Sequence, residues 1–154
     1  MSTFTLDAAN FQDLPQLSQL LGELFTIEKD FAPNPERQQQ GLKLLLEHPE
    51  STHVLVARDS QGIAIGMCSV QLVISTAQGS YAAWVEDLIV TKDFQKQGVA
   101  KALLHAAIRW AGEHGVTRMQ LLVDMENQAA LEFYHYLGWK TTQLQARHYF
   151  LTNE

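Results

Sequence analysis

The amino-acid sequence predicts an α/β (α+β) fold, in which a mixed, mostly antiparallel central sheet is flanked by helices. Two observations on the chain as a whole predict it. Segments with apolar residues at helical spacing alternate with short β-branched runs, and no repeat, low-complexity tract or linker interrupts them. The 154 residues are 46% hydrophobic, enough to bury about two-thirds of the unfolded surface in one core. We therefore expect a single domain over residues 1–154, with the order β-α-α-β-β-β-α-β-α-β-β.

The first half of the chain is expected to form a strand, two helices and a hairpin. Asn10 and Asp13 make a capping pattern ahead of leucines on one helical face, and Pro15 is tolerated because it falls in the first turn. The second helix should stop before Pro49, because a residue ahead of proline disfavours helical backbone. The expected bounds are a strand at 3–8, helices at 10–25 and 36–47, and antiparallel strands within 52–76 joined by a polar turn at 59–62.

The second half continues the alternation of strands and helices. Val99, Leu103 and Ala106 share one face of an amphipathic helix, which is expected to end near Gly115. Asn127 is typical of a helix cap. The expected bounds are strands at 81–90 and 117–124, helices at 98–114 and 127–138, and a closing strand pair within 139–151.

Composition and charge argue against several classes of protein. No apolar run approaches the roughly 18 residues of a membrane span, and the N-terminal residues lack the basic and apolar regions of a secretion signal. The single cysteine, Cys68, cannot form an internal disulfide, which fits the cytoplasm. A net charge of -6 with scattered basic residues argues against nucleic-acid binding and tolerates a cationic partner.

The turn ahead of the helix at 98–114 has features of a phosphate site. In the pattern Gln95-x-x-Gly98-x-Ala100, small residues let a phosphate approach the backbone, and the first helical turn supplies unpaired N–H groups. The turn alone is equally consistent with a glycine that merely starts a helix. It is neither a dinucleotide fingerprint nor a Walker loop, because it lacks their glycines and the Gly-Lys-Ser/Thr triplet.

Two motifs in the sequence resemble those of the Gcn5-related N-acetyltransferase (GNAT) family. "VEDLIVTKDFQKQGVAKALL" is similar to the family's acetyl-CoA segment, and "NQAALEFYHYLGW" is similar to its Asn-x-x-Ala-x-x-Phe-Tyr helix. The resemblance implies acetyl-CoA as cosubstrate, with the turn's amides on the pyrophosphate and a strand edge along the pantetheine arm. It assigns the cofactor to Leu88, Ile89 and Val90, to Gln95, Lys96, Gln97, Gly98, Val99, Ala100 and Lys101, and to Asn127, Ala130 and Tyr134.

Transfer to an amine requires a base, because an amine at neutral pH is an ammonium ion that cannot attack a thioester. Glu86 and Asp87 are the candidates, and the period-two rule places them on opposite faces of their strand, so that only one faces the cofactor groove. The strand is similar to that of the family's polyamine (spermidine/spermine, diamine and thialysine) branch. We expect Glu86 to be the base, directly or through a water, with Asp87 as the alternative. In an arbitrary protein such a pair would more often be solvated.

Two further residues have roles that the resemblance implies. Tyr134 lies where many members place a tyrosine that protonates the departing thiolate, although its apolar stripe also suits an ordinary core aromatic. Glu28 is expected to anchor a cationic acceptor together with Glu86 and Asp87, and a solvated loop is an equally good interpretation.

The sequence therefore predicts direct transfer of an acetyl group from acetyl-CoA to a primary amine, with a small polyamine-like or amino-acid-like acceptor favoured. A protein or peptide amine as acceptor, or a non-catalytic acyl-CoA sensor, are the alternatives. Cys68 lacks a neighbouring base in sequence, and the histidines lack metal-ligand spacing, so neither a nucleophile nor a metal is expected. We also expect a homodimer, by analogy with similar proteins.

Overall fold

The computed structural model describes residues 3–152. The chain divides into two compact units, Met1–Leu122 and Val123–Glu154. Whether residues 1–154 act as a single domain stays a prediction. Among the helices of residues 3–152, none has both the length and the apolar composition that crossing a bilayer requires.

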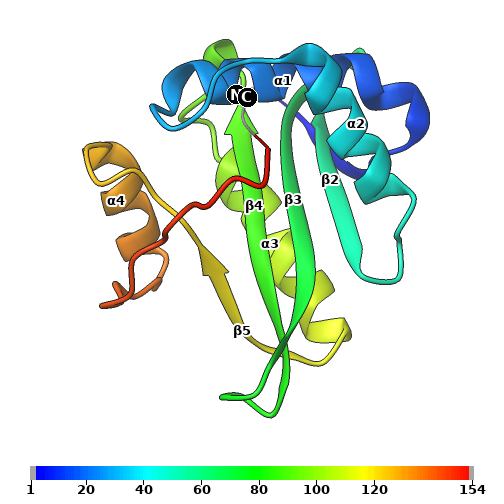
Figure 1. The fold of residues 1–154 in the computed structure, drawn as a ribbon. Coiled ribbons are helices and arrows are strands. Elements are labelled where there is room, and N and C mark those ends of the chain that lie inside the picture. The colour runs from blue at the N-terminus through cyan, green and yellow to red at the C-terminus, as the bar shows by residue number, and fades with distance from the viewer. Residues whose placement is uncertain (1–2, 153–154) are drawn as a thin grey trace. The chain divides into compact units, whose positions relative to one another are not determined.

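The first unit is built on a five-stranded sheet with the spatial order β1-β2-β3-β4-β5 (Figure 1). Neighbouring strands from β1 to β4 are antiparallel, and β4 and β5 run parallel. The predicted mixed, mostly antiparallel sheet is therefore confirmed. The strands are β1 (Thr5–Ala8), β2 (Thr52–Arg58), β3 (Ala64–Ser75), β4 (Ser80–Val90) and β5 (Val116–Leu121).

Capping residues mark the starts of helices in this unit, and those at Asn10 and Gly98 fall where the sequence predicts. Asn10 and Asp13 form a capping box around a short 3-10 turn, and the Asn34 side chain accepts a hydrogen bond from the N–H of Arg37. Gly98 caps α3 with a φ of 85°, in the left-handed region that glycine adopts readily. The helices are α1 (Leu14–Ile27), α2 (Pro35–Leu46) and α3 (Val99–Glu113).

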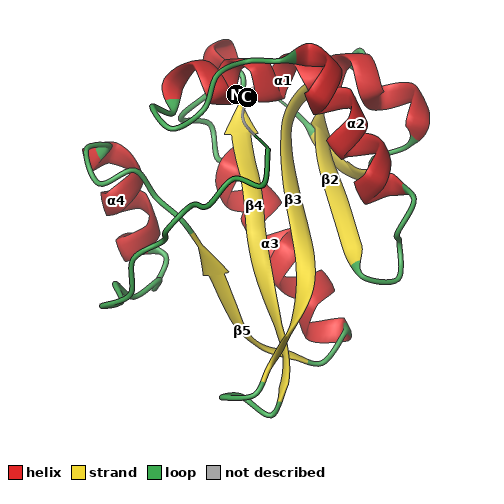
Figure 2. Ribbon diagram, in the orientation of Figure 1, coloured by secondary structure: helices red, strands yellow, loops and turns green. Residues whose placement is uncertain are grey.

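The central strands are buried on both faces. Along β2, Val54 and Val56 pack with leucines of α1 and α2, whereas Leu55 and Ala57 are also buried and alternate to the opposite face. Helix α3 packs on β2, β3 and β4 and lies behind the sheet in Figure 2. The two covered faces explain why "HVLVA" is almost continuously apolar.

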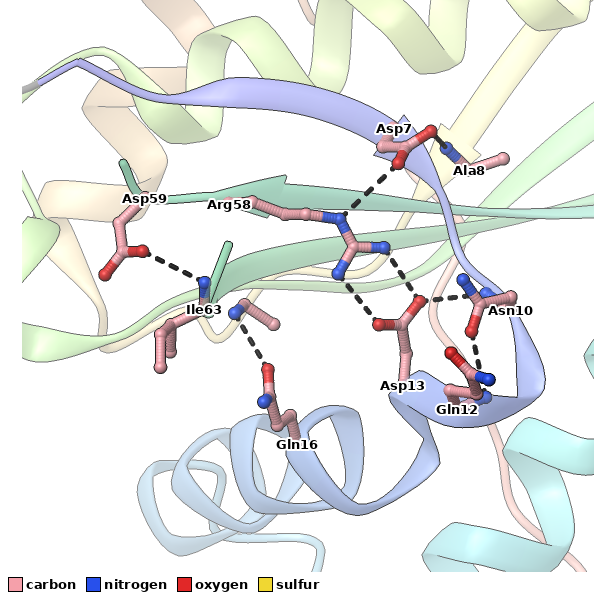
Figure 3. A network of polar contacts seen from close by, with 10 residues as sticks. Asp7, Ala8, Asn10, Gln12, Asp13, Gln16, Arg58, Asp59 and Ile63 are labelled. Carbon is pink, nitrogen blue, oxygen red and sulfur yellow. Dashed lines mark hydrogen bonds and ion pairs between the residues drawn. The ribbon is translucent and has the colours of Figure 1, made fainter. Parts of the chain in front are cut away.

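A polar network ties the N-terminal strand to β2 (Figure 3). The Arg58 guanidinium donates two hydrogen bonds to the Asp13 carboxylate, at 2.8 and 2.9 Å, and its Nε lies 3.5 Å from Asp7 Oδ2. Asp13 Oδ2 also accepts the N–H of Asn10 at 2.9 Å. The hydrogen bonds from Arg58 make the largest contribution to lowering the pKa of Asp13 below its usual value, the bond from Asn10 adds to it, and burial opposes both.

The second unit contains α4 (Gln128–Tyr136), which Asn127 caps as predicted and which is followed by Gly138 at a φ of 93°. The predicted closing strand pair within 139–151 is wrong, because no residue of 139–152 is in a strand. The β-branched and aromatic residues there have a strand-like composition, but a strand also needs a partner for its backbone groups. The apolar side chains Leu144, Tyr149, Phe150 and Leu151 are exposed instead.

Candidate functional site

Strands β4 and β5 separate part-way along the sheet. Their pairing ends at Val85 and Leu121, where β5 ends, whereas β4 continues to Val90. Residues 87–90 pair with β3 on one side, and no strand among residues 3–152 pairs with residues 86–90 on the other. The backbone predicted to meet the pantetheine arm, at Leu88, Ile89 and Val90, therefore lies along a free sheet edge.

A β-bulge lies just beyond the point of separation. Ser69 of β3 pairs with Asp87 and Val70 pairs with Val85, so Glu86 is an extra residue without a partner. A bulge bends its strand and changes the direction of its side chains. Glu86 is exposed, and Asp87 is buried at 9% exposure.

A cavity of about 110 Å³ opens at this point of the sheet. Its wall includes three carboxylate residues, Glu28, Glu86 and Asp87, so that both strand carboxylates line one space despite the period-two rule. The bulge accounts for this difference from the expectation that only one would face the groove. The remaining lining residues are Phe25, Phe31, Trp84, Val85, Gln120, Leu121 and Leu122.

The aromatic side chains of this cavity were not assigned as site residues from the sequence. Phe25 belongs to α1 and Phe31 to the loop after it, and their rings lie 5.6 Å apart between centroids. Trp84 comes from β4, two residues before the bulge. Neither phenylalanine belongs to a recognisable motif, because their approach to β4 depends on how α1 packs on the sheet. Aromatic faces beside carboxylates suit an organic cation.

Asp87 has an unusual environment for a carboxylate. Burial raises its pKa to about 6, a nearby Glu86 charge contributes in the same direction, and a hydrogen bond from Ser69 opposes them. The Ser69 hydroxyl donates to Asp87 Oδ2 at 2.6 Å. Ser69 was not a candidate from the sequence, where it is one small polar residue in the apolar run "GMCSV".

The turn from Gln95 to Gly98 places free amides at the start of α3. Lys96 and Gly98 both have positive φ, at 63° and 85°. The first backbone bond of the helix runs from the N–H of Ala102 to the C=O of Gly98, at 3.0 Å, so the amides before Ala102 have no acceptor within the helix. Gln95 Nε2 donates to the C=O of Val90 at 2.9 Å, which ties the turn to the end of β4.

The other predicted site residues lie in the second unit, around α4. The Asn127 side chain accepts the N–H of Ala130 at 3.1 Å, so its amide oxygen has a structural partner. The Tyr134 ring lies edge-on to Phe133 and Trp139, with centroids 5.2 and 6.1 Å away. The cofactor role of Asn127 and the acid role of Tyr134 stay predictions.

The overall architecture and the acetyl-CoA motif agree with one known family. The family model described as the acetyltransferase (GNAT) family matches residues 14–139. The chain belongs to this family. Its membership is confirmed, whereas the spermidine/spermine branch stays a prediction.

Proteins similar to this GNAT-family chain include an uncharacterized N-acetyltransferase of Methanocaldococcus jannaschii, 23% identical over 145 residues that make up 94% of this chain and 64% of that protein. The chain thus spans less than two-thirds of that relative's length. A solved structure described as a transcriptional regulator from Bacillus halodurans C-125 has a TM-score of 0.83 at 26% identity, covering 96% of this chain and 100% of that one. The aminoglycoside N-acetyltransferase AAC(6')-Iy in complex with CoA has a TM-score of 0.82 at 19% identity, covering 99% and 97%, and shows the fold alone.

The single cysteine of this GNAT-family chain is buried in β3, opposite Leu88 of β4. Cys68 is fully buried, and desolvation raises the pKa of its thiol to about 12, so the reactive thiolate is scarce at neutral pH. Within residues 3–152, no three or more His, Cys, Asp or Glu side chains are grouped so that they could hold a metal ion.

Proposed function

We propose that this protein is an acetyl-CoA-dependent N-acetyltransferase that acetylates the primary amine of a small cationic acceptor. The observation that carries the proposal is the cavity at the separation of β4 and β5, where Glu28, Glu86 and Asp87 meet aromatic side chains. A cavity of this composition attracts an ammonium group by charge and by the faces of its aromatic rings. It lies beside the free strand edge that supports the cofactor part of the proposal.

Two features support acetyl-CoA as the donor. The free edge of β4 at residues 86–90 offers backbone donors and acceptors to the amide groups of a pantetheine arm. The amides at the start of α3, together with the positive end of the helix dipole, suit a pyrophosphate. Membership of the GNAT family and the fold shared with a CoA complex point in the same direction.

The proposed reaction is direct transfer without an acyl-enzyme. A carboxylate of the cavity takes one proton from the bound ammonium group, and the neutral amine then attacks the thioester carbonyl carbon, breaking the C–S bond. The N–H of Leu88 polarises the carbonyl oxygen, and Tyr134 donates a proton to the departing thiolate of coenzyme A. The acetylated nitrogen passes its second proton to the Tyr134 phenolate as the amide forms, which regenerates the tyrosine.

The favoured acceptors are small amines such as polyamines, diamines or amino acids. The lining supports this class, because three carboxylates in a space of about 110 Å³ suit a narrow aminoalkyl chain. An aminoglycoside, the substrate class in the name of one structural relative, also presents primary ammonium groups. A cytoplasmic location and a homodimer belong to the same proposal and rest on the sequence.

The test is a thiol-release assay with acetyl-CoA against spermidine, putrescine, thialysine, lysine, an aminoglycoside and short peptides. We expect release with one amine class, and a strong loss in Glu86→Gln and Asp87→Asn that Glu50→Gln, an exposed carboxylate outside the cavity, does not share. Tight coenzyme A binding without release for any amine would contradict the proposal and favour an acyl-CoA sensor. Release with peptides alone would favour a protein acceptor.

A further inference from the structure

The bulge in β4 places a buried hydroxyl directly behind one of the two candidate bases. Ser69 is 0% exposed and lies opposite Asp87 in the β3–β4 register. Its hydroxyl donates to Asp87 Oδ2 at 2.6 Å and accepts the backbone N–H of Asp87 at 3.2 Å. Ser69 therefore restrains both the side chain and the backbone of the same residue.

This clamp leaves one oxygen of Asp87 available to the cavity. Among the described residues, no hydrogen bond to Asp87 Oδ1 is formed, and no buried side-chain oxygen lacks a partner. Oδ1 is therefore in contact with open space, and Asp87 lines the cavity. One carboxylate oxygen of this cavity residue is held by Ser69, and the other accepts no hydrogen bond from the described residues.

Among residues 3–152, no hydrogen bond restrains the Glu86 side chain in a comparable way. This residue is exposed, it is the unpaired residue of the bulge, and its longer side chain has one more rotatable bond than that of Asp87. A base that is held in one orientation loses less conformational freedom when it meets the amine. A proton acceptor also works best with a pKa near the working pH, and the pKa of Asp87 is raised to about 6.

We propose that Ser69 is a positioning residue of the acceptor cavity: its hydroxyl holds the Asp87 carboxylate so that this side chain, rather than Glu86, removes the proton from the bound amine. The inference rests on the proposed function and identifies which carboxylate serves it. The proton passes from the ammonium nitrogen to Asp87 Oδ1, leaving a neutral amine and a carboxylic acid. Glu86 and Glu28 then act through their charges.

The two neighbours of Asp87 should shift its titration in opposite directions. Ser69→Ala removes a hydrogen bond that favours the charged form, so the pKa of Asp87 should rise by about one unit, the order expected for one charge-assisted bond. Glu86→Gln removes a negative charge that disfavours ionisation of Asp87, so the pKa of Asp87 should fall. Restoring a hydroxyl with Ser69→Thr should bring the titration back toward the wild-type value.

The experiment combines carbon-13 NMR titration of the aspartate carboxyls with the pH profile of kcat/KM for the amine that the thiol-release panel selects. We expect one carboxyl to titrate near pH 6, to disappear in Asp87→Asn, and to move up in Ser69→Ala and down in Glu86→Gln. The acidic limb of the pH profile should follow the same shifts. Ser75→Ala, which removes another buried hydroxyl of β3 outside the cavity, should leave the limb in place.

The inference fails if activity survives in Asp87→Asn but is lost in Glu86→Gln. It also fails if NMR detects a shift in the pKa of Asp87 and the acidic limb of the kcat/KM profile does not move with it. A purely structural role for Ser69 would lower the stability of Ser69→Ala and leave the limb unmoved. Absence of thiol release with every amine would instead contradict the proposed function, and with it the inference. The two failures are therefore distinguishable.

Discussion

Replacing Asp13 by asparagine should show how much the Arg58 ion pair contributes to stability. The substitution removes the charge opposite Arg58 and keeps an oxygen that can accept the N–H of Asn10. The side chains of Asp13 and Arg58 are only 9% and 16% exposed, respectively. In the variant, the Arg58 guanidinium would therefore have little contact with water and one remaining carboxylate, Asp7, at 3.5 Å. Removing one partner of such a buried pair costs about 3 to 5 kcal/mol, and the remaining carboxylate favours the lower end, about 3 kcal/mol.

Urea unfolding followed by far-ultraviolet circular dichroism measures this loss, and thermal unfolding should show a midpoint lower by about 6 to 12 °C. The pH dependence adds a second check. Because the pKa of Asp13 is lowered in the folded protein, its stabilisation is present above the usual carboxyl pKa of 3.8 and is lost as the pH falls through the lower folded value. Wild type and Asp13→Asn should therefore converge in acid.

Asp7→Asn is the matched control, because Asp7 contacts the same guanidinium but is 63% exposed. We expect it to cost less than about 1 kcal/mol, as exposed pairs do. A loss for Asp13→Asn no larger than that of Asp7→Asn would refute the reasoning that burial makes this contact strong.

Three further substitutions test the turn, the sheet and a half-buried histidine. Gly98→Ala should lower the free energy of unfolding by about 1 kcal/mol, because the φ of Gly98 is 85°, and should weaken coenzyme A binding measured by calorimetry. Gly115→Ala, at a φ of 75° after α3, is the control: it should lower stability by a similar amount and leave coenzyme A binding intact. Gly66→Ala should lower the free energy of unfolding in urea by about 1 to 3 kcal/mol, since its Cβ would lie 3.1 Å from a β4 backbone oxygen. Gly41→Ala in α2 has open space and should stabilise the protein. Burial lowers the pKa of His53, so as the pH falls from about 7 to 5 the unfolded chain binds a proton at this histidine before the folded protein does, and the wild type loses stability. His53→Gln should reduce this dependence of the free energy of unfolding on pH. An unchanged pH dependence would contradict the prediction.

Local pattern was sufficient to predict the first unit of the fold. The capping box at Asn10 and the glycine at the start of α3 act through residues within one turn, so their effect is visible in the sequence. The closing strands were predicted wrongly, because residues 139–151 have a strand-like composition that does not reveal whether a partner is present.

The candidate site was less accessible to prediction than the fold. The carboxylates Glu86 and Asp87 stand in a recognisable motif, but their meeting in one cavity depends on a bulge, which is a property of the register between two strands. Ser69 reaches Asp87 only through that register, and Phe25 reaches the cavity through the packing of α1. Such relations between distant segments leave no local signature in one sequence.

The free edge of β4 also bears on the colloidal behaviour of the protein. An uncovered strand edge presents unpaired donors and acceptors to any other extended chain, and charged or proline residues usually guard such an edge. Over Leu88, Ile89 and Val90 neither kind of guard is present. If coenzyme A lies along this edge, it also covers the unpaired backbone groups and prevents another chain from pairing with them. Protein stripped of the cofactor should then aggregate faster at high concentration than protein saturated with it, which light scattering would detect.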